Sequence, residues 1–205
     1  MKTNFWDFCA PIYDTAAKAN SRAYGDMLKI VRGLVPQGST VLELAAGTGA
    51  ISLIVSDKAG SILCSDWSVK MLAVAQRKAA KLGVKNVSFE RLNIFETGKP
   101  DNSFDVVIAS QVLNLFDNPE DAAAELRRVA KHMVILPTSF IKDLRGSGKL
   151  SINVCRLFGF APKFELDAAS FSSFLPDIGF ENCDIIQIPG RIPMAVAVWN
   201  KTQNE

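Results

Sequence analysis

The sequence predicts a single doubly wound α/β domain with a mainly parallel seven-stranded sheet and one antiparallel strand near the C-terminus. Short β-prone apolar runs alternate with segments of helical periodicity over most of the chain, which favours parallel strands joined by right-handed crossovers. The last two strand-like runs are joined by a short turn-rich link, which is typical of a hairpin. With 205 residues, 48% of them hydrophobic, the chain suffices for one domain with a sizeable core.

Each expected strand is an apolar run bounded by turn or loop residues. In chain order these runs span residues 40–44, 61–65, 87–92, 104–109, 133–136, 182–188 and 194–199. Helices are expected over residues 15–34, 51–56, 69–82, 118–130 and 167–178. Ser68 is suited to cap the third of these helices and Gly83 to end it, while Pro119 suits the first turn of the fourth.

Composition argues against several classes of protein. Lys plus Arg total 23 and Asp plus Glu total 21, which gives a formal net charge of +2. A dedicated nucleic-acid-binding protein usually carries a strongly basic face, so no nucleic-acid partner is expected. No apolar run approaches the roughly 18 residues of a transmembrane helix, and Asp7 and Asp14 interrupt any N-terminal secretory signal. We therefore expect a cytoplasmic protein.

The cysteines do not predict a metal centre. They lie far apart, form no Cys-x-x-Cys pair and are accompanied by a single histidine: Cys9, Cys64, Cys155 and Cys183. Structural zinc sites use closely spaced ligands, so we expect no metal and reduced thiols. Cys64 lies inside a predicted strand, which also disfavours chemistry on a soft metalloid.

The strongest chemical signal follows the first predicted strand. Residues 45–49, Ala-Ala-Gly-Thr-Gly, form a loop of small residues between that strand and a helix. Small side chains let a ligand approach the backbone closely, and a helix N-terminus offers unpaired N–H groups. A Gly-x-Gly pair alone is also compatible with a simple tight turn.

Asp66 ends the second predicted strand and strengthens the ligand interpretation. An acidic residue roughly 20 positions after a glycine loop is suited to bind a ribose diol. The alternative is that Asp66 caps the next helix in competition with Ser68. Together the loop and the carboxylate indicate an adenosine-containing ligand at the carboxyl ends of the strands.

Glu43 helps to distinguish between adenosine ligands. It extends the loop pattern to Glu-x-Ala-x-Gly-x-Gly over residues 43–49, whereas a nicotinamide site normally reads Gly-x-Gly-x-x-Gly with no preceding acid. This pattern resembles motif I of the class I S-adenosylmethionine-dependent methyltransferases, whose usual form is Glu/Asp-x-Gly-x-Gly-x-Gly. The resemblance implies a Rossmann-like fold, S-adenosylmethionine as the cofactor and methyltransferase activity.

Further segments extend the resemblance over about residues 39–137. Residues 66–72 resemble the family's second motif, residues 102–107 resemble its fourth-strand motif, and residues 125–129 resemble the helix before its fifth strand. The ordered motifs are more specific together than any one of them is alone.

The sequence departs from the family pattern at three places. Ala45 replaces the usual first glycine and still leaves room for a ligand at the backbone. Asn93 stands where Asp is common, and its amide is able to accept from the adenine amino group or donate to a ring nitrogen. The Pro-Gly-Gly turn that usually precedes the fifth strand is missing, so a shorter connection is expected.

The resemblance implies roles for the residues of motif I. Glu43 would lie near the methionyl amino group. The backbone of Ala45, Gly47 and Gly49 would border the methionyl and ribose parts. Asp66 would hold the ribose hydroxyls.

The resemblance also implies an adenine side. Trp67 would pack on the adenine face, and Met71, from the second motif, would belong to the same cofactor site. Asn93 and Ile94 would lie at the adenine edge. Alternatively, Ile94 belongs to the core alone and Trp67 is a surface aromatic.

Residues from other segments complete the implied site. Ser110 and Gln111 would line it after the fourth strand. Tyr13 resembles the N-terminal tyrosine of the ubiquinone/menaquinone-type small-molecule methyltransferases and would contact the cofactor or the substrate. Packing of Tyr13 between helices is the alternative.

No catalytic residue is assigned, because the sulfonium already activates the methyl group and the enzyme mainly aligns a nucleophile for in-line displacement. His132 precedes the fifth predicted strand, away from the expected site, and is interpreted as structural. No Asn/Asp-Pro-Pro-Tyr/Phe motif follows the fourth strand, which argues against nucleic-acid and glutamine acceptors. A small-molecule or lipid-like acceptor is expected, such as a quinone-like compound or a phospholipid amine.

The domain is expected to have four parts: an N-terminal helical lid over residues 1–35, a cofactor-binding core over 36–137, a covering insertion over 138–166, and a C-terminal helix and β-hairpin over 167–205. Apolar side chains of the two non-core segments either converge as a cover over the site or pack these segments onto the core. They are Phe5, Trp6, Phe8, Phe140, Leu157, Phe158, Phe160 and Phe164.

Two other functions remain open from the sequence. A nicotinamide-dependent oxidoreductase is disfavoured by the absent third glycine and by the lack of a Tyr-x-x-x-Lys pair. A nucleoside-binding protein without catalysis stays possible, because methyl transfer leaves so little residue signature.

Overall fold

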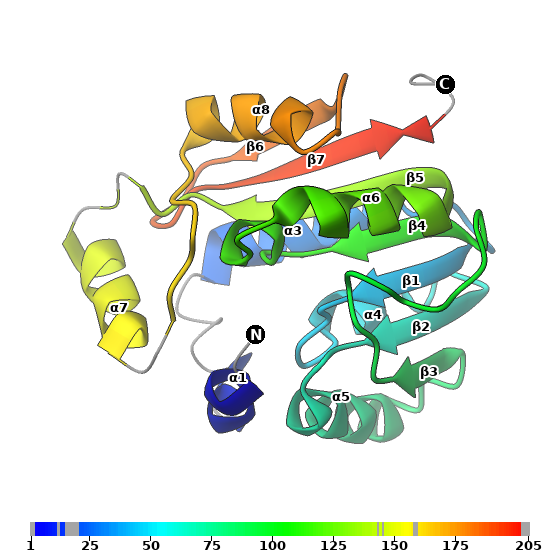
Figure 1. Cartoon of the computed structure of the whole chain (residues 1–205). Helices are drawn as coiled ribbons and strands as arrows, with labels where there is room; N and C mark the ends of the chain where they lie inside the picture. The colour runs from blue at the N-terminus through cyan, green and yellow to red at the C-terminus, as the bar shows by residue number, and fades with distance from the viewer. Residues whose placement is uncertain are drawn as a thin grey trace.

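The computed structural model describes residues 3–11, 13–14, 21–142, 144, 146–157 and 160–201. Their core is one seven-stranded sheet in the order β3-β2-β1-β4-β5-β7-β6, with helices on both faces (Figure 1). The strands are β1 Thr40–Leu44, β2 Ser61–Ser65, β3 Val87–Glu90, β4 Phe104–Ala109, β5 Ala130–Ser139, β6 Asp184–Ile188 and β7 Met194–Asn200. The first five strands run parallel, and β7 pairs antiparallel with both β5 and β6. The predicted fold class is confirmed.

Alternation along the strands separates two apolar layers. Leu42 and Val107 face one side, where they pack with α6 (Pro119–Val129) and α8 (Ala168–Asp177). Val41 and Val106 face the other side, where they pack with α3 (Ser21–Leu34) and α4 (Ala50–Val55). Successive side chains of a strand point to opposite faces, so every central strand contributes to both layers.

The remaining helices lie around this core. They are α1 (Thr3–Cys9), α5 (Val69–Leu82), the short 3₁₀ helix η1 (Leu113–Leu115) and α7 (Gly146–Leu157). In Figure 1, α1 lies beside α5, on the side of the sheet to which β1 and β2 point. The part of the expected helix 15–34 that the structure describes is α3, and residues 15–20 lie outside the described residues.

The predicted helix signals are present as local contacts. Ser68 caps α5 by accepting a hydrogen bond from the Met71 amide at 3.2 Å. Gly83 ends that helix at φ 69°, a left-handed conformation that favours glycine. Pro119 occupies the first turn of α6. In addition, Asp167 and Ser170 form a capping box at the start of α8, which was not predicted.

β5 is longer than the predicted run 133–136 because no turn separates it from α6. The helix ends at Val129, and Ala130 already pairs with Phe104 of β4. The other end of β5 is extended by pairing with β7, where Ser139 lies opposite Met194. The prediction that His132 precedes the strand is therefore wrong. His132 lies within β5, and its exposed side chain is 3.8 Å from Asp105 Oδ1.

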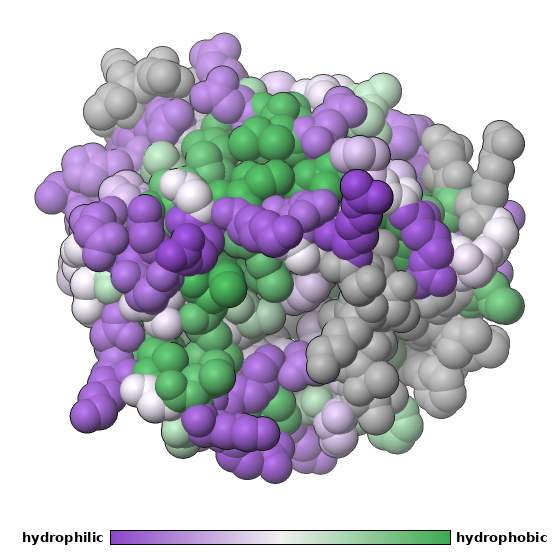
Figure 2. Space-filling view, turned by 180° about the vertical axis from the view of Figure 1, so that it is seen from behind, coloured by the Kyte–Doolittle hydropathy of each residue, from purple (hydrophilic) through white to green (hydrophobic). Residues whose placement is uncertain are grey.

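Apolar surface is distributed over several elements. The view from behind shows hydrophilic residues around apolar areas (Figure 2). Large exposed apolar side chains of the described residues include Phe8, Ile54, Trp67, Val69, Leu82, Phe95, Leu150, Phe164 and Ile186. Among the helices of the described residues, none has the length and apolar character needed to cross a bilayer.

Replacement of Gly49 tests how closely the loop after β1 packs against α5. Gly49 has φ 74°, and a Cβ there would lie 2.9 Å from Ala75 Cβ. We expect Gly49→Ala to lower the free energy of unfolding by about 2–4 kcal/mol, the sum of left-handed strain and overpacking. Urea denaturation measures the change.

Gly83→Ala is the matched control, because Gly83 has φ 69° with no atom within 4 Å of an added Cβ. It is expected to show the backbone strain alone, about 1–2 kcal/mol. Compared with Ala75→Gly alone, the double variant Gly49→Ala/Ala75→Gly should show the backbone strain without the overpacking, because Ala75→Gly by itself costs about 1 kcal/mol of helix stability. Equal losses for Gly49→Ala and Gly83→Ala would contradict the close packing.

Candidate functional site

A cavity of about 330 Å³ opens at the carboxyl ends of the parallel strands. Its walls come from the segments that follow β1, β2, β3 and β4, together with the N-terminal segment. The strand order reverses between β1 and β4, and ligands of open α/β sheets bind at such a switch point. The structure brings these predicted site residues to its wall: Tyr13, Ala45, Gly47, Asp66, Trp67, Met71, Asn93, Ile94, Ser110 and Gln111.

The loop after β1 exposes its backbone to the cavity. Ala45 and Gly47 have φ 54° and 55°, and neither carries a side chain larger than a methyl group. The Ala46 amide donates to the Ser65 carbonyl at 2.8 Å, which ties the loop to the end of β2. Backbone N–H groups of turns that include left-handed residues are typical of concavities that bind anionic groups.

Asp66 holds this loop from the end of β2. Its Oδ2 accepts from the Gly47 amide at 2.8 Å, and its Oδ1 accepts from the Ser68 amide at 2.7 Å. Burial raises the pKa of the Asp66 carboxyl, although both hydrogen bonds act in the opposite direction. Each carboxylate oxygen is able to accept more than one hydrogen bond. Asp66, which lines the cavity, can therefore also accept hydrogen bonds from a ligand. Ser68, rather than Asp66, accepts the hydrogen bond that caps α5.

Glu43 and Gly49 are not part of the cavity wall. The Glu43 side chain is 2% exposed and faces α4, where its Oε2 accepts from the Ser52 amide at 2.8 Å and the Ser52 hydroxyl at 2.5 Å. Burial raises the pKa of Glu43 to about 7, and the hydrogen bonds from Ser52 limit the shift. Gly49 begins α4 and packs against Ala75. Both residues support the loop from behind.

The N-terminal segment lies on the same loop. The Tyr13 ring is 3.9 Å from the position that a Cβ on Gly47 would occupy. Asp14 Oδ1 accepts from the Thr48 hydroxyl at 2.5 Å, and Asp14 Oδ2 forms an ion pair with Lys78 at 2.9 Å. The Ser68 hydroxyl donates to Asp7. These contacts attach residues distant in sequence to the loop and to α5.

Tyr13 is a protonated donor at neutral pH. Burial raises its pKa to about 12, and the nearby negative charges of Asp66 and Asp14 add to the shift. The phenol therefore keeps its proton beside the glycine loop, where it is able to donate a hydrogen bond.

Some of the non-core apolar side chains gather at the cavity and others do not. Trp6 lines the cavity and forms ring contacts with Phe5 at 4.8 Å, with Tyr13 at 6.3 Å and with Phe160 at 6.4 Å. Two others pack against α8 instead: Phe140 contacts Phe171 and Phe164 contacts Phe174. The Phe8 side chain is 61% exposed. Phe158 and the side chain of Leu157 lie outside the described residues.

The loop after β3 forms a second wall. Asn93 Oδ1 accepts from the Phe95 amide at 3.2 Å, which closes a tight turn. Ile94 is 7% exposed and belongs to the main core cluster while also lining the cavity, so it combines both predicted roles. Trp67, 38% exposed, carries the Arg91 guanidinium 4.0 Å from its ring centroid.

Gln111 is held at the end of β4 in an unusual backbone conformation. It has φ 55°, and its amide donates to the Pro137 carbonyl at 2.8 Å. Its Oε1 accepts from the Ser139 hydroxyl at 2.9 Å. A non-glycine residue in the left-handed region is uncommon and often lies at a functional site.

Sequence reasoning missed several lining residues. They are Leu92, Phe95, Val112, Leu115 and Phe116. Most of them follow β3 or β4 at the same carboxyl edge, and that position was the available signal. Trp6 was expected as one of two alternatives, a cover over the site or packing on the core, and the structure places it at the cavity.

Comparison with known proteins agrees with this geometry. Residues 36–152 match a family model described as a methyltransferase domain. The phosphatidylethanolamine N-methyltransferase of Cereibacter sphaeroides is 30% identical over 110 residues, 52% of this chain and 54% of that protein. The demethylmenaquinone methyltransferase of Renibacterium salmoninarum is 32% identical over 130 residues, 62% of this chain and 52% of that protein. The matches therefore span about half the length of these relatives.

Solved structures share the fold. DhpI, in its complex with SAH, has a TM-score of 0.72 at 22% identity and covers 96% of this chain and 94% of its own. A SAM-dependent methyltransferase from Aquifex aeolicus has a TM-score of 0.65 at 20% identity, with 91% and 97% covered.

The family model spans the sheet core that carries the loop after β1, the end of β2 and the walls after β3 and β4. The chain therefore belongs to the methyltransferase domain family, which confirms its resemblance to the class I S-adenosylmethionine-dependent methyltransferases.

Proposed function

We propose that this protein transfers a methyl group from S-adenosylmethionine to a small-molecule or lipid-like acceptor. One observation carries the proposal: the bare loop at Ala45 and Gly47 and the carboxylate of Asp66 face one cavity and are hydrogen-bonded to each other. In a methyltransferase-family chain, a backbone surface next to an acid at the following strand end suits a nucleoside with an amino-acid tail.

Each wall of the cavity supplies a different part of the binding site. Asp66 would hold the ribose hydroxyls, and Trp67 would pack on the adenine face, with Met71 beside it. The backbone of Ala45 and Gly47 would border the amino-acid tail. Gly49 and Glu43 act from behind the loop, Gly49 through packing and Glu43 through its charge.

The chain's remaining task is alignment. Bound S-adenosylmethionine supplies a methyl group that its sulfonium already activates. Ser110, Gln111 and Tyr13 lie around the same cavity and would orient an acceptor in line with that methyl group. The first part of the expected lid 1–35, which includes Trp6 and Tyr13, and residues 138–166 would serve as lid and cover and exclude water, whereas α3 packs on the sheet and belongs to the core.

The apolar residues that line the cavity indicate the proposed chemical class of the acceptor. Trp6, Leu115 and Phe116 line the cavity and favour a partly apolar molecule. Two relatives are named for phosphatidylethanolamine and for demethylmenaquinone, both lipid-like molecules. A quinone-like or phospholipid-amine acceptor is therefore the proposed class.

Calorimetric titration with S-adenosylmethionine, S-adenosylhomocysteine and NAD tests the cofactor. Binding of both sulfur nucleosides without NAD is expected, and binding of NAD alone would point to an oxidoreductase. Turnover on phosphatidylethanolamine vesicles and on a demethylated quinone then tests catalysis. Nucleoside binding with no transfer to any acceptor would favour a binding protein.

Replacement of Asp66 should weaken the nucleoside. Asp66→Ala removes the acceptor from the Gly47 amide and from the ribose, and should cost about 1–3 kcal/mol of binding free energy for S-adenosylhomocysteine. Asp66→Asn keeps one acceptor oxygen and is expected to lose less. Calorimetry measures both affinities, and an unchanged affinity for Asp66→Ala would remove Asp66 from the site.

The proton on Glu43 should make nucleoside binding depend on pH. With its pKa raised to about 7, Glu43 is largely protonated at pH 6, whereas a ligand ammonium nearby favours the carboxylate. Nucleoside binding should then release a proton from Glu43 below pH 7. As the pH is lowered further, the affinity for S-adenosylhomocysteine should fall by up to about tenfold per pH unit.

The Glu43→Gln variant is the control for this dependence. It should bind more weakly than the unsubstituted chain at pH 8 and about equally at pH 6. Calorimetry in two buffers of different ionisation enthalpy counts the released proton. Equal proton release by the variant and the unsubstituted chain would show that another group titrates.

A further inference from the structure

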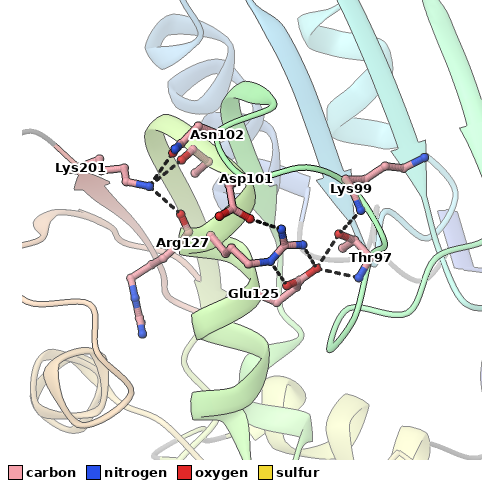
Figure 3. Close-up of polar contacts among 9 residues, drawn as sticks. Thr97, Lys99, Asp101, Asn102, Glu125, Arg127 and Lys201 are labelled. Atoms are coloured by element: carbon pink, nitrogen blue, oxygen red, sulfur yellow. Dashed lines mark hydrogen bonds and ion pairs between the residues drawn. The ribbon is translucent and has the colours of Figure 1, made fainter.

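A buried carboxylate on α6 holds the loop after β3 at Thr97, directly after the turn bridged by Asn93 and Glu96. Glu125, 8% exposed, accepts on its Oε1 from the Thr97 amide at 2.7 Å and from the Thr97 hydroxyl at 2.5 Å (Figure 3). Thr97 is itself 5% exposed. One oxygen atom thus fixes both the backbone and the side chain of the residue that closes the loop.

The charge of Glu125 is balanced on the helix side. Arg128 donates to both carboxylate oxygens, from Nε at 2.7 Å and from Nη2 at 2.8 Å, and also pairs with Asp101 at 2.5 Å. Burial alone would raise the pKa of Glu125, but these hydrogen bonds outweigh it and hold the pKa at about 2. The carboxylate is therefore charged at neutral pH, and its hydrogen bonds to Thr97 are charge-assisted.

The loop that Thr97 closes is a wall of the cavity. It contributes Asn93, Ile94 and Phe95, and Phe95 packs on Phe116 from the opposite wall with 4.7 Å between ring centroids. Asn93 also forms an isolated bridge with Glu96, the residue before Thr97. A shift of Thr97 would therefore move the wall residues that lie two to four positions earlier.

The turn also determines which end of the Asn93 amide is available. Asn93 Oδ1 accepts from the Phe95 amide. Because that amide is a donor, the side-chain oxygen of Asn93 and not its nitrogen faces it. Nδ2 is then the donor end of the amide towards a ligand, while Oδ1 keeps its second lone pair as an acceptor. A donor suits the unprotonated ring nitrogen at position 1 of adenine, which accepts a hydrogen bond. Hypoxanthine carries an N–H group at that position and cannot accept from a donor there.

We propose that Glu125 and Thr97 are positioning residues for base recognition, which hold Asn93 so that its Nδ2 discriminates adenine from hypoxanthine. This inference rests on the proposed nucleoside site. Neither residue is part of the cavity wall, and both act through the loop between them and the ligand.

The experiment compares two substitutions at one position. Thr97→Val keeps the size of the side chain and the amide hydrogen bond but removes the hydroxyl donor to Glu125. Thr97→Ser keeps the hydroxyl. Asp101→Asn is a second control, because it weakens the ion pair with Arg128 and leaves the Thr97 contacts in place.

Calorimetry measures the affinity of each chain for S-adenosylhomocysteine and for S-inosylhomocysteine. The ratio of the two affinities does not depend on the fraction of folded protein, so simple destabilisation leaves it unchanged. The unsubstituted chain should prefer the adenine ligand by about tenfold or more, the value of one well-placed hydrogen bond.

Thr97→Val should lower this preference to about threefold or less, through loss of the ordered loop, while Thr97→Ser and Asp101→Asn retain it. An unchanged preference in Thr97→Val, an equal loss in Thr97→Ser, or no preference in the unsubstituted chain would overturn the inference alone. Failure of the unsubstituted chain to bind S-adenosylhomocysteine would overturn the proposed function, and the inference with it.

Discussion

The hydrogen bond from the Gly47 amide to the Asp66 carboxylate is the interaction on which the rest of the site depends. It joins the loop after β1 to the end of β2, which are the carboxyl ends of two neighbouring parallel strands. Because Ala45 and Gly47 carry almost no side chain, the backbone of this loop stays accessible to a ligand. The other walls of the cavity are arranged around this accessible backbone. The charged side chains nearest to the loop determine which chemical groups of a ligand bind there.

Much of the fold follows from local signals in the sequence. β1, β2 and β4 have the predicted bounds, since each is an apolar run between strong turn residues. Gly83 ended its helix as expected because only local conformation decides that end. β5 departs from its prediction because its length depends on pairing with β7, and no local pattern of residues 130–139 encodes a partner so distant in sequence.

The site was predictable wherever a residue directly follows a parallel strand. Asp66 was expected at the cavity for that reason and Gln111 because the family resemblance implies it, and both line the cavity. Glu43 lies behind the loop instead, because alternation along β1 points its side chain towards α4. Trp6 and the contact between Glu125 and Thr97 join segments far apart in the chain, and only the folded structure brings them together.

The proposed S-adenosyl nucleoside lies across the carboxyl ends of β1 and β2. The most direct measurement is the change in backbone amide NMR shifts on titration with S-adenosylhomocysteine. The largest changes are expected at Ala45 and Gly47 and at residues 66–67 and 93–95, with little change around Arg127 on α6. Changes concentrated away from the carboxyl ends of the strands, or none at Gly47, would contradict the claim.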